Sequence, residues 1–408
     1  MPELKGQELA LHTILAGENV FVTGGGGVGK SWVIREIKRD KTILCAPSGI
    51  AALNIGGITC HKAFKLPTSV VTKKDYKIDK TTRALLSPSN LDRVVIDEGS
   101  MLRADYLDLI NWKLQKARCN SNPFGGVQMV IVGDFYQIPP IVSNHDKEQF
   151  YGEQGYKSRF SFSSRSWNFK TVELEKVYRQ SDKRQINILK SIRKRDHNYE
   201  KALRIIQKEA KPYNPNNPSI NLCVFNKDAD SINNYWFDQL ETQVHTFNAK
   251  YTGKWTASEK PVADKLELRE GAKVVICANL EGLYSNGERG VVTSVSTLCV
   301  FVTKNNGEKV TIEPKTWERF KYSEGGKFVD ATYTQYPLKL GWAISIHKSQ
   351  GMTLDAATIN IGRGCFEHGQ LYVGLSRVKD LRNLSFSEYV DPSNVIVQRE
   401  VQEFYGHS

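Results

Sequence analysis

The feature that most constrains this sequence is a glycine-rich run near its start. Gly24-Gly25-Gly26-Gly27-Val28-Gly29-Lys30-Ser31 fits the phosphate-binding pattern G-x-x-x-x-G-K-[ST]. An apolar, β-prone run, Val20-Phe21-Val22-Thr23, comes directly before it, and a helical pattern with Val33, Ile34 and Ile37 follows. A strand, a glycine-rich loop and a helix in this order predict a nucleotide-binding α/β domain.

The chemistry of this loop predicts its ligand. Glycines such as Gly24, Gly27 and Gly29 let successive backbone N–H groups point at phosphate oxygens, which a Cβ would obstruct. Lys30 is then placed to reach the β- and γ-phosphates, and the Ser31 hydroxyl to bind Mg²⁺. We therefore expect a nucleoside triphosphate with its metal ion.

Three further apolar, β-branched runs predict more strands of the same sheet: Thr42–Cys45, Val94–Ile96 and Met129–Val132. Helix-length segments separate them, so we expect a parallel sheet with crossover helices. Ligands of such sheets collect at the carboxyl ends of the strands. The polar residues at those ends are Asp97-Glu98 and the segment Gly133–Pro140.

These polar strand ends suit triphosphate hydrolysis. One carboxylate of the Asp97-Glu98 pair would hold the water shell of Mg²⁺, and the other would orient or deprotonate the attacking water. We assign the metal contact to Asp97. The amide of Gln137 both donates and accepts hydrogen bonds, which suits a sensor of the γ-phosphate or its water.

The composition narrows the class of partner. With 408 residues the chain is expected to form two or three domains, and its formal charge of +12 favours a polyanion, with nucleic acid as the first guess. The seven cysteines are scattered singly, which argues against a zinc module or a disulfide framework. No signal peptide or bilayer-spanning run is evident, so we expect an intracellular protein without a membrane partner.

The pattern changes along the chain predict the domains. Residues 1–158 form a first domain, whose weakly patterned, basic insertion 65–92 is either a small wedge-like subdomain that contacts nucleic acid or an ordinary solvated loop. Residues 159–267 and 336–408 form a second α/β domain. Residues 268–335 form an inserted antiparallel β module, since Asn306-Gly307 lies between two β-prone runs as in a tight hairpin.

The ordered set of motifs resembles superfamily 1 DNA helicases of the branch that contains the Pif family, phage Dda and RecD, and is most similar to the Pif family. The most specific of these motifs is the run from Trp342 to Gly351. The matching segments are 24–31, 46–52, 57–64, 97–101, 133–140, 177–180, 341–354 and 369–377.

The resemblance implies an α/β fold in which two RecA-like P-loop domains face each other across ATP, with a small inserted β-barrel. Lys30, Asp97, Glu98 and Gln137 would act from the first domain. Arg179 and Arg377 would act from the second, where they stabilise transition-state charge only when the cleft closes. Further nucleotide contacts are implied for two residues: Gln7, which would read adenine, and Gly351.

The resemblance also implies single-stranded DNA and forked duplex DNA as partners, with movement in the 5′ to 3′ direction. We expect a monomer, working beside single-strand binding or replisome proteins in a prokaryotic or phage-infected cell. The strand-separating element stays open, because Tyr76 is the one aromatic residue in the insertion 65–92. The implied single-strand contacts are Pro47, Ser48, Thr59, His61, Phe64, His347, Lys348 and Ser349.

Two other functions remain open from the sequence. The chain is either a DNA helicase or a related motor, namely a translocase that does not unwind duplex DNA or an RNA helicase. An ATP-gated nucleic-acid binding protein is a different class, and Glu98 with both candidate arginines speaks against it. A small-molecule kinase explains neither Gly133–Pro140 nor Ile346–Gly351.

Overall fold

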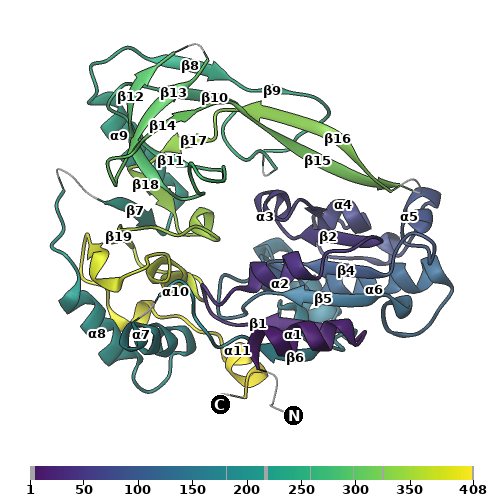
Figure 1. The fold of residues 1–408 in the computed structure, drawn as a ribbon. Helices are drawn as coiled ribbons and strands as arrows, with labels where there is room; N and C mark the ends of the chain where they lie inside the picture. The colour runs from purple at the N-terminus through teal and green to yellow at the C-terminus, as the bar shows by residue number, and fades with distance from the viewer. Residues whose placement is uncertain are drawn as a thin grey trace.

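The computed structural model describes residues 5–406 except 181, 216–218, 258, 297, 324 and 325, with only the backbone at 321–327. Two α/β lobes lie side by side, and an antiparallel β-module extends over both of them (Figure 1). We call the lobe that contains the glycine-rich loop the first lobe and the other the second lobe. The predicted α/β class with parallel sheets is confirmed.

The first lobe is built on a parallel sheet in the order β3-β2-β4-β5-β1-β6. Successive residues of its strands face opposite sides: Val20 and Val22 pack against α1 and α2, whereas Phe21 packs toward α6. Both faces are covered, which explains the continuous apolar runs. The strands are β1 Val20–Thr23, β2 Thr42–Ala46, β3 Ile58–Thr59, β4 Arg93–Ile96, β5 Gln128–Val132 and β6 Lys170–Glu173. The helices are α1 Gly6–Leu15, α2 Lys30–Glu36, α3 Gly49–Asn54, α4 Cys60–Phe64, α5 Lys80–Leu85 and α6 Ala104–Arg118.

The second lobe has a smaller parallel sheet in the order β18-β7-β19-β20. Two helices, α7 and α8, precede its first strand, and the chain breaks between them at Arg195, where φ is 51°. The strands are β7 Ile220–Cys223, β18 Ala343–Ser345, β19 Ala357–Asn360 and β20 Leu384–Phe386. The helices are α7 Lys183–Lys194, α8 Tyr199–Glu209, α9 Asn226–Asp238 and α10 Gln370–Leu375.

The β-module contains three antiparallel ladders, with strand orders β14-β13-β12-β11-β17, β10-β8 and β15-β16-β9. The predicted hairpin at Asn306-Gly307 connects β13 and β14, and Gly307 has the φ of 86° that such turns require. The β15–β16 hairpin reaches across to α3 and α5 of the first lobe (Figure 1). The strands are β8 His245–Asn248, β9 Lys250–Tyr251, β10 Lys265–Leu268, β11 Lys273–Ile276, β12 Arg289–Val295, β13 Val300–Lys304, β14 Lys309–Ile312, β15 Lys315–Ser323, β16 Gly326–Gln335 and β17 Leu338–Leu340.

Several segments pack differently from the domain boundaries expected from the sequence. Strand β6 lies beyond 158 but pairs with β1 in the first sheet. The C-terminal helix α11 (Arg399–Phe404) lies beyond 336 but packs against the first lobe through Val401 and Phe404. Strands β8, β9, β10 and β17 join the β-module from outside 268–335. In each case long-range pairing, which local patterns do not encode, decides the neighbour.

The insertion 65–92 is ordered against the first lobe. It contains a short 3₁₀ turn at Lys73–Asp75 and helix α5, which packs on α6. Its aromatic residue Tyr76 meets Trp112 of α6 edge to face, with ring centroids 5.4 Å apart. In the described part of the chain, no helix combines the length and the apolarity needed to cross a membrane.

Candidate nucleotide site and nucleic-acid face

The glycine-rich loop joins β1 to α2 and takes a conformation that its glycines make possible. Gly24, Gly27 and Gly29 have φ values of 140°, 81° and 86°, which side chains with a Cβ rarely adopt. A Cβ on Gly27 would also collide with Arg179, and one on Gly29 would collide with Gln7. The glycines therefore let two distant segments approach the loop.

Lys30 begins α2 and folds back over the loop. Its ammonium donates hydrogen bonds to the carbonyl oxygens of Gly24 at 2.6 Å and Gly25 at 2.9 Å. Burial lowers the pKa of Lys30, while the carboxylates of Asp134 and Glu98 act in the opposite direction. The loop thus holds the Lys30 ammonium at its centre. Its N–H groups, which now donate to two loop carbonyls, can donate to phosphate oxygens instead.

Asp97 and Glu98 follow β4 as predicted, but they occupy different positions. Glu98 has a left-handed backbone with φ 51°, a strain of about 1–2 kcal/mol, and lines the cavity in front of the loop. Asp97 lies behind it and accepts the Glu98 N–H at 2.9 Å. Burial and the neighbouring charge of Glu98 raise the pKa of Asp97 to about 7.

Two arginines of the second lobe complete the opposite wall. Arg179 donates to the carbonyl of Ser376 at 3.0 Å, and Arg377 donates to the carbonyl of Val373 at 2.8 Å. Burial and the charge of Arg179 lower the pKa of Arg377 to about 9. No carboxylate among the described residues forms an ion pair with either guanidinium. Both cations line the cavity, where an anionic ligand would stabilise their buried charge.

The residues predicted for the nucleotide converge on one cavity of about 520 Å³ between the lobes, a size typical of a ligand site. Gln7 reaches it from α1, donating weakly to Val28 and Gly29 carbonyls and accepting from the Tyr178 hydroxyl. Gly24 and Asp97 lie outside its lining. The lining residues are Gln7, Gly26, Gly27, Val28, Gly29, Lys30, Ser31, Trp32, Glu98, Gln137, Tyr178, Arg179, Gly351 and Arg377.

Sequence reasoning missed two aromatic residues of this cavity, Trp32 and Tyr178. Tyr178 is 56% exposed, and the ammonium of Lys176 lies 5.1 Å from its ring centre. The position of Tyr178 directly before Arg179 was the available signal, because neighbours on an irregular segment can line the same cleft, as these two residues do.

The predicted nucleic-acid contacts of the first lobe lie around α3 and α4. The Ser48 hydroxyl caps α3 by accepting the Ala51 N–H, and the Thr59 hydroxyl caps α4 by accepting the Lys62 N–H. Pro47, Ser48, Thr59 and His61 are all half-buried, and the His61 ring lies edge to face on Tyr106. Their exposed edges remain available to a ligand.

Two of the predicted contacts are wrong. Phe64 is fully buried in the hydrophobic core of the first lobe, so its ring has no face for a base. Ser349 is also fully buried, and its hydroxyl donates to the Ile346 carbonyl at 2.8 Å. Beside it in the same short 3₁₀ turn, His347–Ser349, His347 is half-buried and Lys348 is exposed.

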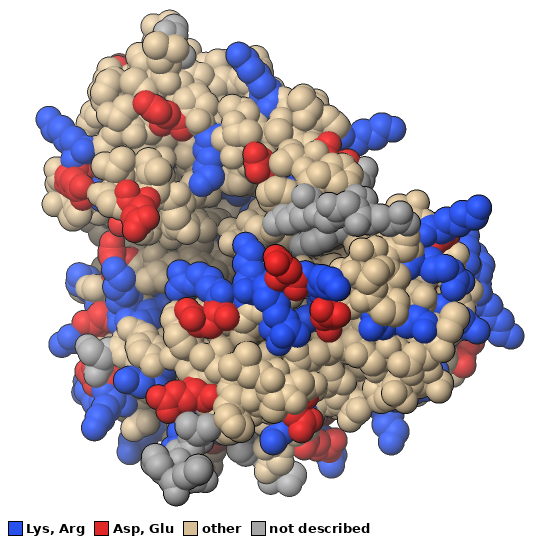
Figure 2. All heavy atoms as spheres, turned by 45° about the vertical axis from the view of Figure 1, so that its right-hand side comes forward, with Lys and Arg blue, Asp and Glu red and all other residues tan. Residues whose placement is uncertain are grey.

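The β-module covers part of this face. Glu259 forms ion pairs with Lys62 of α4 and with Arg319 of β15, the latter at 3.6 Å. These three side chains line one small pocket together with Trp255 and Thr59. Figure 2 shows Lys and Arg side chains along the rim of the first lobe that faces the β-module, with a hollow between the two.

Comparison with known proteins gives consistent matches. A family model described as PIF1-like helicase matches residues 5–208. An ATP-dependent DNA helicase PIF1 of Xenopus laevis is 33% identical over 98% of this chain and 63% of its own length. An ATP-dependent DNA helicase Pif1 of Campylobacter jejuni is 31% identical over 97% of this chain and 96% of its own length. The chain thus spans less than two thirds of the Xenopus protein.

Solved structures agree with the sequence matches. A Bacteroides Pif1 in complex with ADP-AlF4 superposes with a TM-score of 0.89 at 31% identity, covering 100% of this chain and 97% of that one. A Bacteroides Pif1 bound to ssDNA superposes with a TM-score of 0.68 at 32% identity, covering 98% and 95%. This chain therefore superposes more closely on the structure with ADP-AlF4 than on the one with ssDNA.

Proposed function

This chain belongs to the PIF1-like helicase family, and we propose that it is an ATP-dependent DNA helicase that translocates on single-stranded DNA and separates duplex DNA. The observation that carries the proposal is the interlobe cavity. It combines a phosphate loop, Glu98 and Gln137 from one lobe with two guanidiniums from the other, neither of which pairs with a carboxylate in the described part of the chain. This arrangement stabilises transition-state charge in phosphoryl transfer only when both lobes contribute.

The proposed roles follow from the positions of the side chains. Lys30 holds the β- and γ-phosphates, and Glu98 orients and deprotonates the attacking water. Gln137 contacts the γ-phosphate or that water. Arg179 and Arg377 neutralise charge on the transferred phosphoryl group. Gln7 pairs with the base edge. Its amide lies at the cavity, where it both donates a hydrogen bond to the loop and accepts one from the hydroxyl of Tyr178.

The residues beside the loop fit a magnesium ion. Mg²⁺ takes oxygen ligands, and in nucleotide sites it needs one or two protein oxygens beside the phosphates. The hydroxyl of Ser31 on the cavity wall and the carboxylate of Asp97 behind it are such oxygens. Bound there, the ion would neutralise charge on the phosphates.

Single-stranded DNA is the proposed polymer, and a forked duplex the proposed substrate. A Bacteroides relative is bound to ssDNA in one solved structure, and another structure concerns forked dsDNA and two coordinating helicases. We propose that the strand crosses Pro47, Ser48, Thr59 and His61 on the first lobe, then His347 and Lys348 on the second. Movement from 5′ to 3′ and a monomeric motor are part of the same proposal.

The finer architecture is also a proposal. The two parallel sheets correspond to RecA-like domains, and the β-module to the small barrel of Pif relatives. The insertion 65–92 would act as the wedge, with Tyr76 as its one aromatic side chain. The placement of Glu98 and both arginines on one cavity favours a hydrolysing motor over an ATP-gated binding protein.

A forked-substrate assay tests the function. The protein should unwind a forked DNA duplex with ATP and Mg²⁺, and a forked RNA duplex much less. Lys30→Ala should abolish DNA-stimulated hydrolysis and unwinding while single-strand binding persists. Hydrolysis without unwinding would indicate a translocase, preferred unwinding of RNA would indicate an RNA helicase, and absence of DNA-stimulated hydrolysis would overturn the motor.

A further inference from the structure

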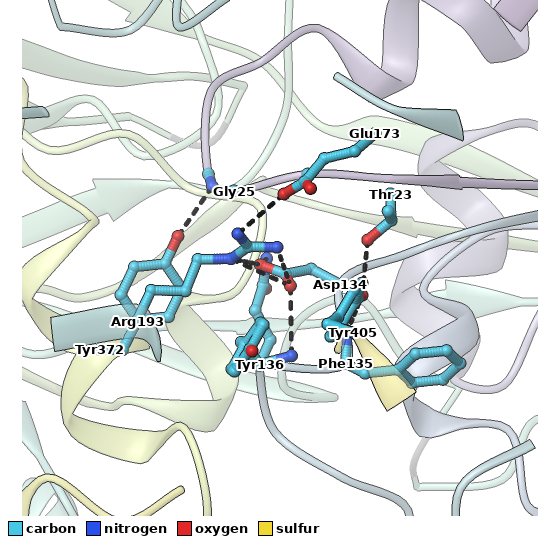
Figure 3. A network of polar contacts seen from close by, with 12 residues as sticks. Thr23, Gly25, Asp134, Phe135, Tyr136, Glu173, Arg193, Tyr372 and Tyr405 are labelled. Atoms are coloured by element: carbon cyan, nitrogen blue, oxygen red, sulfur yellow. Dashed lines mark hydrogen bonds and ion pairs between the residues drawn. The ribbon is translucent and has the colours of Figure 1, made fainter. Parts of the chain in front are cut away.

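Behind the phosphate loop, polar side chains from both lobes form a buried network that the proposed roles above do not use (Figure 3). Asp134 follows β5 of the first lobe, and Arg193 is on α7 of the second. The Arg193 guanidinium donates three hydrogen bonds to the Asp134 carboxylate, at 2.8 to 3.2 Å. Its third nitrogen donates to Glu173, at the end of β6, at 3.1 Å.

This ion pair is deeply buried and tightly enclosed. The Arg193 side chain is 5% exposed, and that of Asp134 is 0% exposed. The Arg193 guanidinium also lies 4.7 Å from the ring centre of Tyr136, and Tyr136 stacks on Tyr405 after α11. Burial works against a charged Asp134, but the charge and hydrogen bonds of Arg193 hold its pKa below the usual range. The pair therefore stays ionised inside the seam.

Asp134 connects this pair to the nucleotide cavity. Its carboxylate also accepts the Tyr136 backbone N–H at 3.1 Å and the side-chain amide of Gln137 at 3.4 Å. Gln137 lines the cavity, and Lys30 lies close enough for its charge to be influenced by Asp134. One carboxylate thus touches both a second-lobe cation and a first-lobe amide that faces the nucleotide.

A second link runs in parallel. The Tyr372 hydroxyl, from α10 of the second lobe, accepts the backbone N–H of Gly26 in the phosphate loop at 3.0 Å. Ser376 and Arg377 follow Tyr372 one turn later. The second lobe therefore contacts both the phosphate loop and the carboxylate that holds Gln137.

We propose that Arg193 is a positioning residue for hydrolysis: it fixes Asp134 across the seam, and Asp134 fixes the Gln137 amide toward the γ-phosphate. Displacement of α7 relative to β5 then changes where Gln137 points. The inference rests on the proposed ATP hydrolysis but assigns a role to a residue that does not itself touch the nucleotide. Arg193 acts through orientation, so its loss should affect the rate of the chemical step more than nucleotide binding.

The test uses Arg193→Gln and the nearly isosteric Asp134→Asn in the full chain. Single-stranded DNA-stimulated hydrolysis is measured for kcat and KM, nucleotide affinity with a fluorescent ATP analogue, and folding by thermal melting. We expect kcat to fall about tenfold or more in each variant, with KM and analogue affinity within about threefold of the original. Arg193→Lys should recover part of kcat, and the double variant should be no slower than either single one, since the pair acts as a unit.

Arg184→Gln is the matched control, because Arg184 is on the same helix but pairs with Glu209 at the surface of the second lobe. It should leave all three measurements unchanged. Original kcat in folded Arg193→Gln and Asp134→Asn would overturn the inference. So would losses of kcat, analogue binding and folded fraction in the same proportion, because a merely structural pair predicts that result. If the unmutated protein shows no DNA-stimulated hydrolysis, the proposed function fails instead.

Discussion

The seam between the two lobes, which lines the proposed nucleotide cavity, and the proposed nucleic-acid face are held together in different ways. At the seam, fully buried groups of the two lobes interlock, as in the Arg193–Asp134 pair and the His368 ring, which bonds to the Phe135 carbonyl at 2.7 Å. At the proposed nucleic-acid face, the β-module meets the first lobe through the buried Glu259 and through Lys62, whose side chain is 31% exposed. Buried networks have discrete geometries, whereas partly exposed ion pairs contribute little and are exchanged with solvent.

This difference suggests which part moves. The overlap with the Bacteroides complex of ADP-AlF4 is greater than that with the ssDNA complex, and the covered surface here is the one proposed to bind the strand. Glu259 and Thr59 line the same small pocket, so a strand on Thr59 would compete with the contact made by Glu259, whereas the cavity proposed for the nucleotide is already lined by both lobes.

Arg377→Ala should have the largest effect, because it removes a buried cation from the seam. We expect hydrolysis to slow by about 10³-fold or more while ATP still binds, since an interdomain arginine acts mainly on the transition state. Steady-state hydrolysis with single-stranded DNA and binding of an ATP analogue measure the two quantities. Arg382→Ala, at an exposed site five residues on, should change neither the hydrolysis rate nor the affinity for the ATP analogue. A slowing of only a few-fold would mean that the seam is not the catalytic arrangement.

The seam should also give the protein a pH dependence through His368. Burial lowers the pKa of His368 to about 4, from an ordinary 6.5, and its Nδ1 accepts the Gln398 N–H, which requires the neutral ring. Between these values the unfolded chain binds the proton that the folded chain does not. Stability from this group is therefore full above pH 6.5 and lost as the pH falls toward 4, by roughly 3 kcal/mol.

Denaturant unfolding of the original protein and of His368→Gln at several pH values measures this term. The difference in unfolding free energy between them should shrink as the pH falls through that window. Other groups near the ring, including Glu367, Arg159 and Asp134, are present in both proteins and cancel in the comparison. If the difference in unfolding free energy stayed constant from pH 7 to pH 4, His368 would not be a neutral histidine that stabilises the seam.

The same contrast explains what the sequence could predict. The phosphate loop, the strand ends at Asp97 and Gln137, and the α/β class depend on local patterns, and they were recoverable from residue chemistry. Arg179 and Arg377 came only from family resemblance, because nothing local says that two segments about two hundred residues apart meet. Their presence on one cavity with Lys30 depends on how the lobes dock.

The misses have the same physical origin. Phe64 and Ser349 lie in the predicted segments, but their burial depends on what packs over α4 and over the 3₁₀ turn His347–Ser349. Asp134 lay inside a recognised motif without an assigned role, since its partner Arg193 lies 59 residues away on another lobe. Side-chain identity thus predicts chemistry well, whereas exposure and partner choice require the fold.

Glu259→Gln tests the weaker contact at the nucleic-acid face. Removing this charge should loosen the β-module from α4 and strengthen single-strand binding by about two- to fivefold, the range of a partly exposed ion pair. Fluorescence anisotropy with a labelled oligonucleotide measures the affinity. Glu318→Gln removes the same charge from an exposed site on the same module and corrects for general electrostatics. Equal gains in both variants would mean that the Glu259 contact does not restrict access to the strand.

Lys348→Ala should have the smallest effect, and it tests whether the second lobe contributes to the same face. Lys348 is exposed beside His347, so it can pair with a phosphate without giving up a buried partner. A neutralised phosphate on a single strand releases counterions, so the slope of log affinity against log salt should flatten by about 0.7. Lys201→Ala, on the exposed side of α8, should leave the slope unchanged. An unchanged slope in Lys348→Ala would confine the nucleic-acid face to the first lobe and the β-module, and the strand would then not bridge the two lobes that the nucleotide joins.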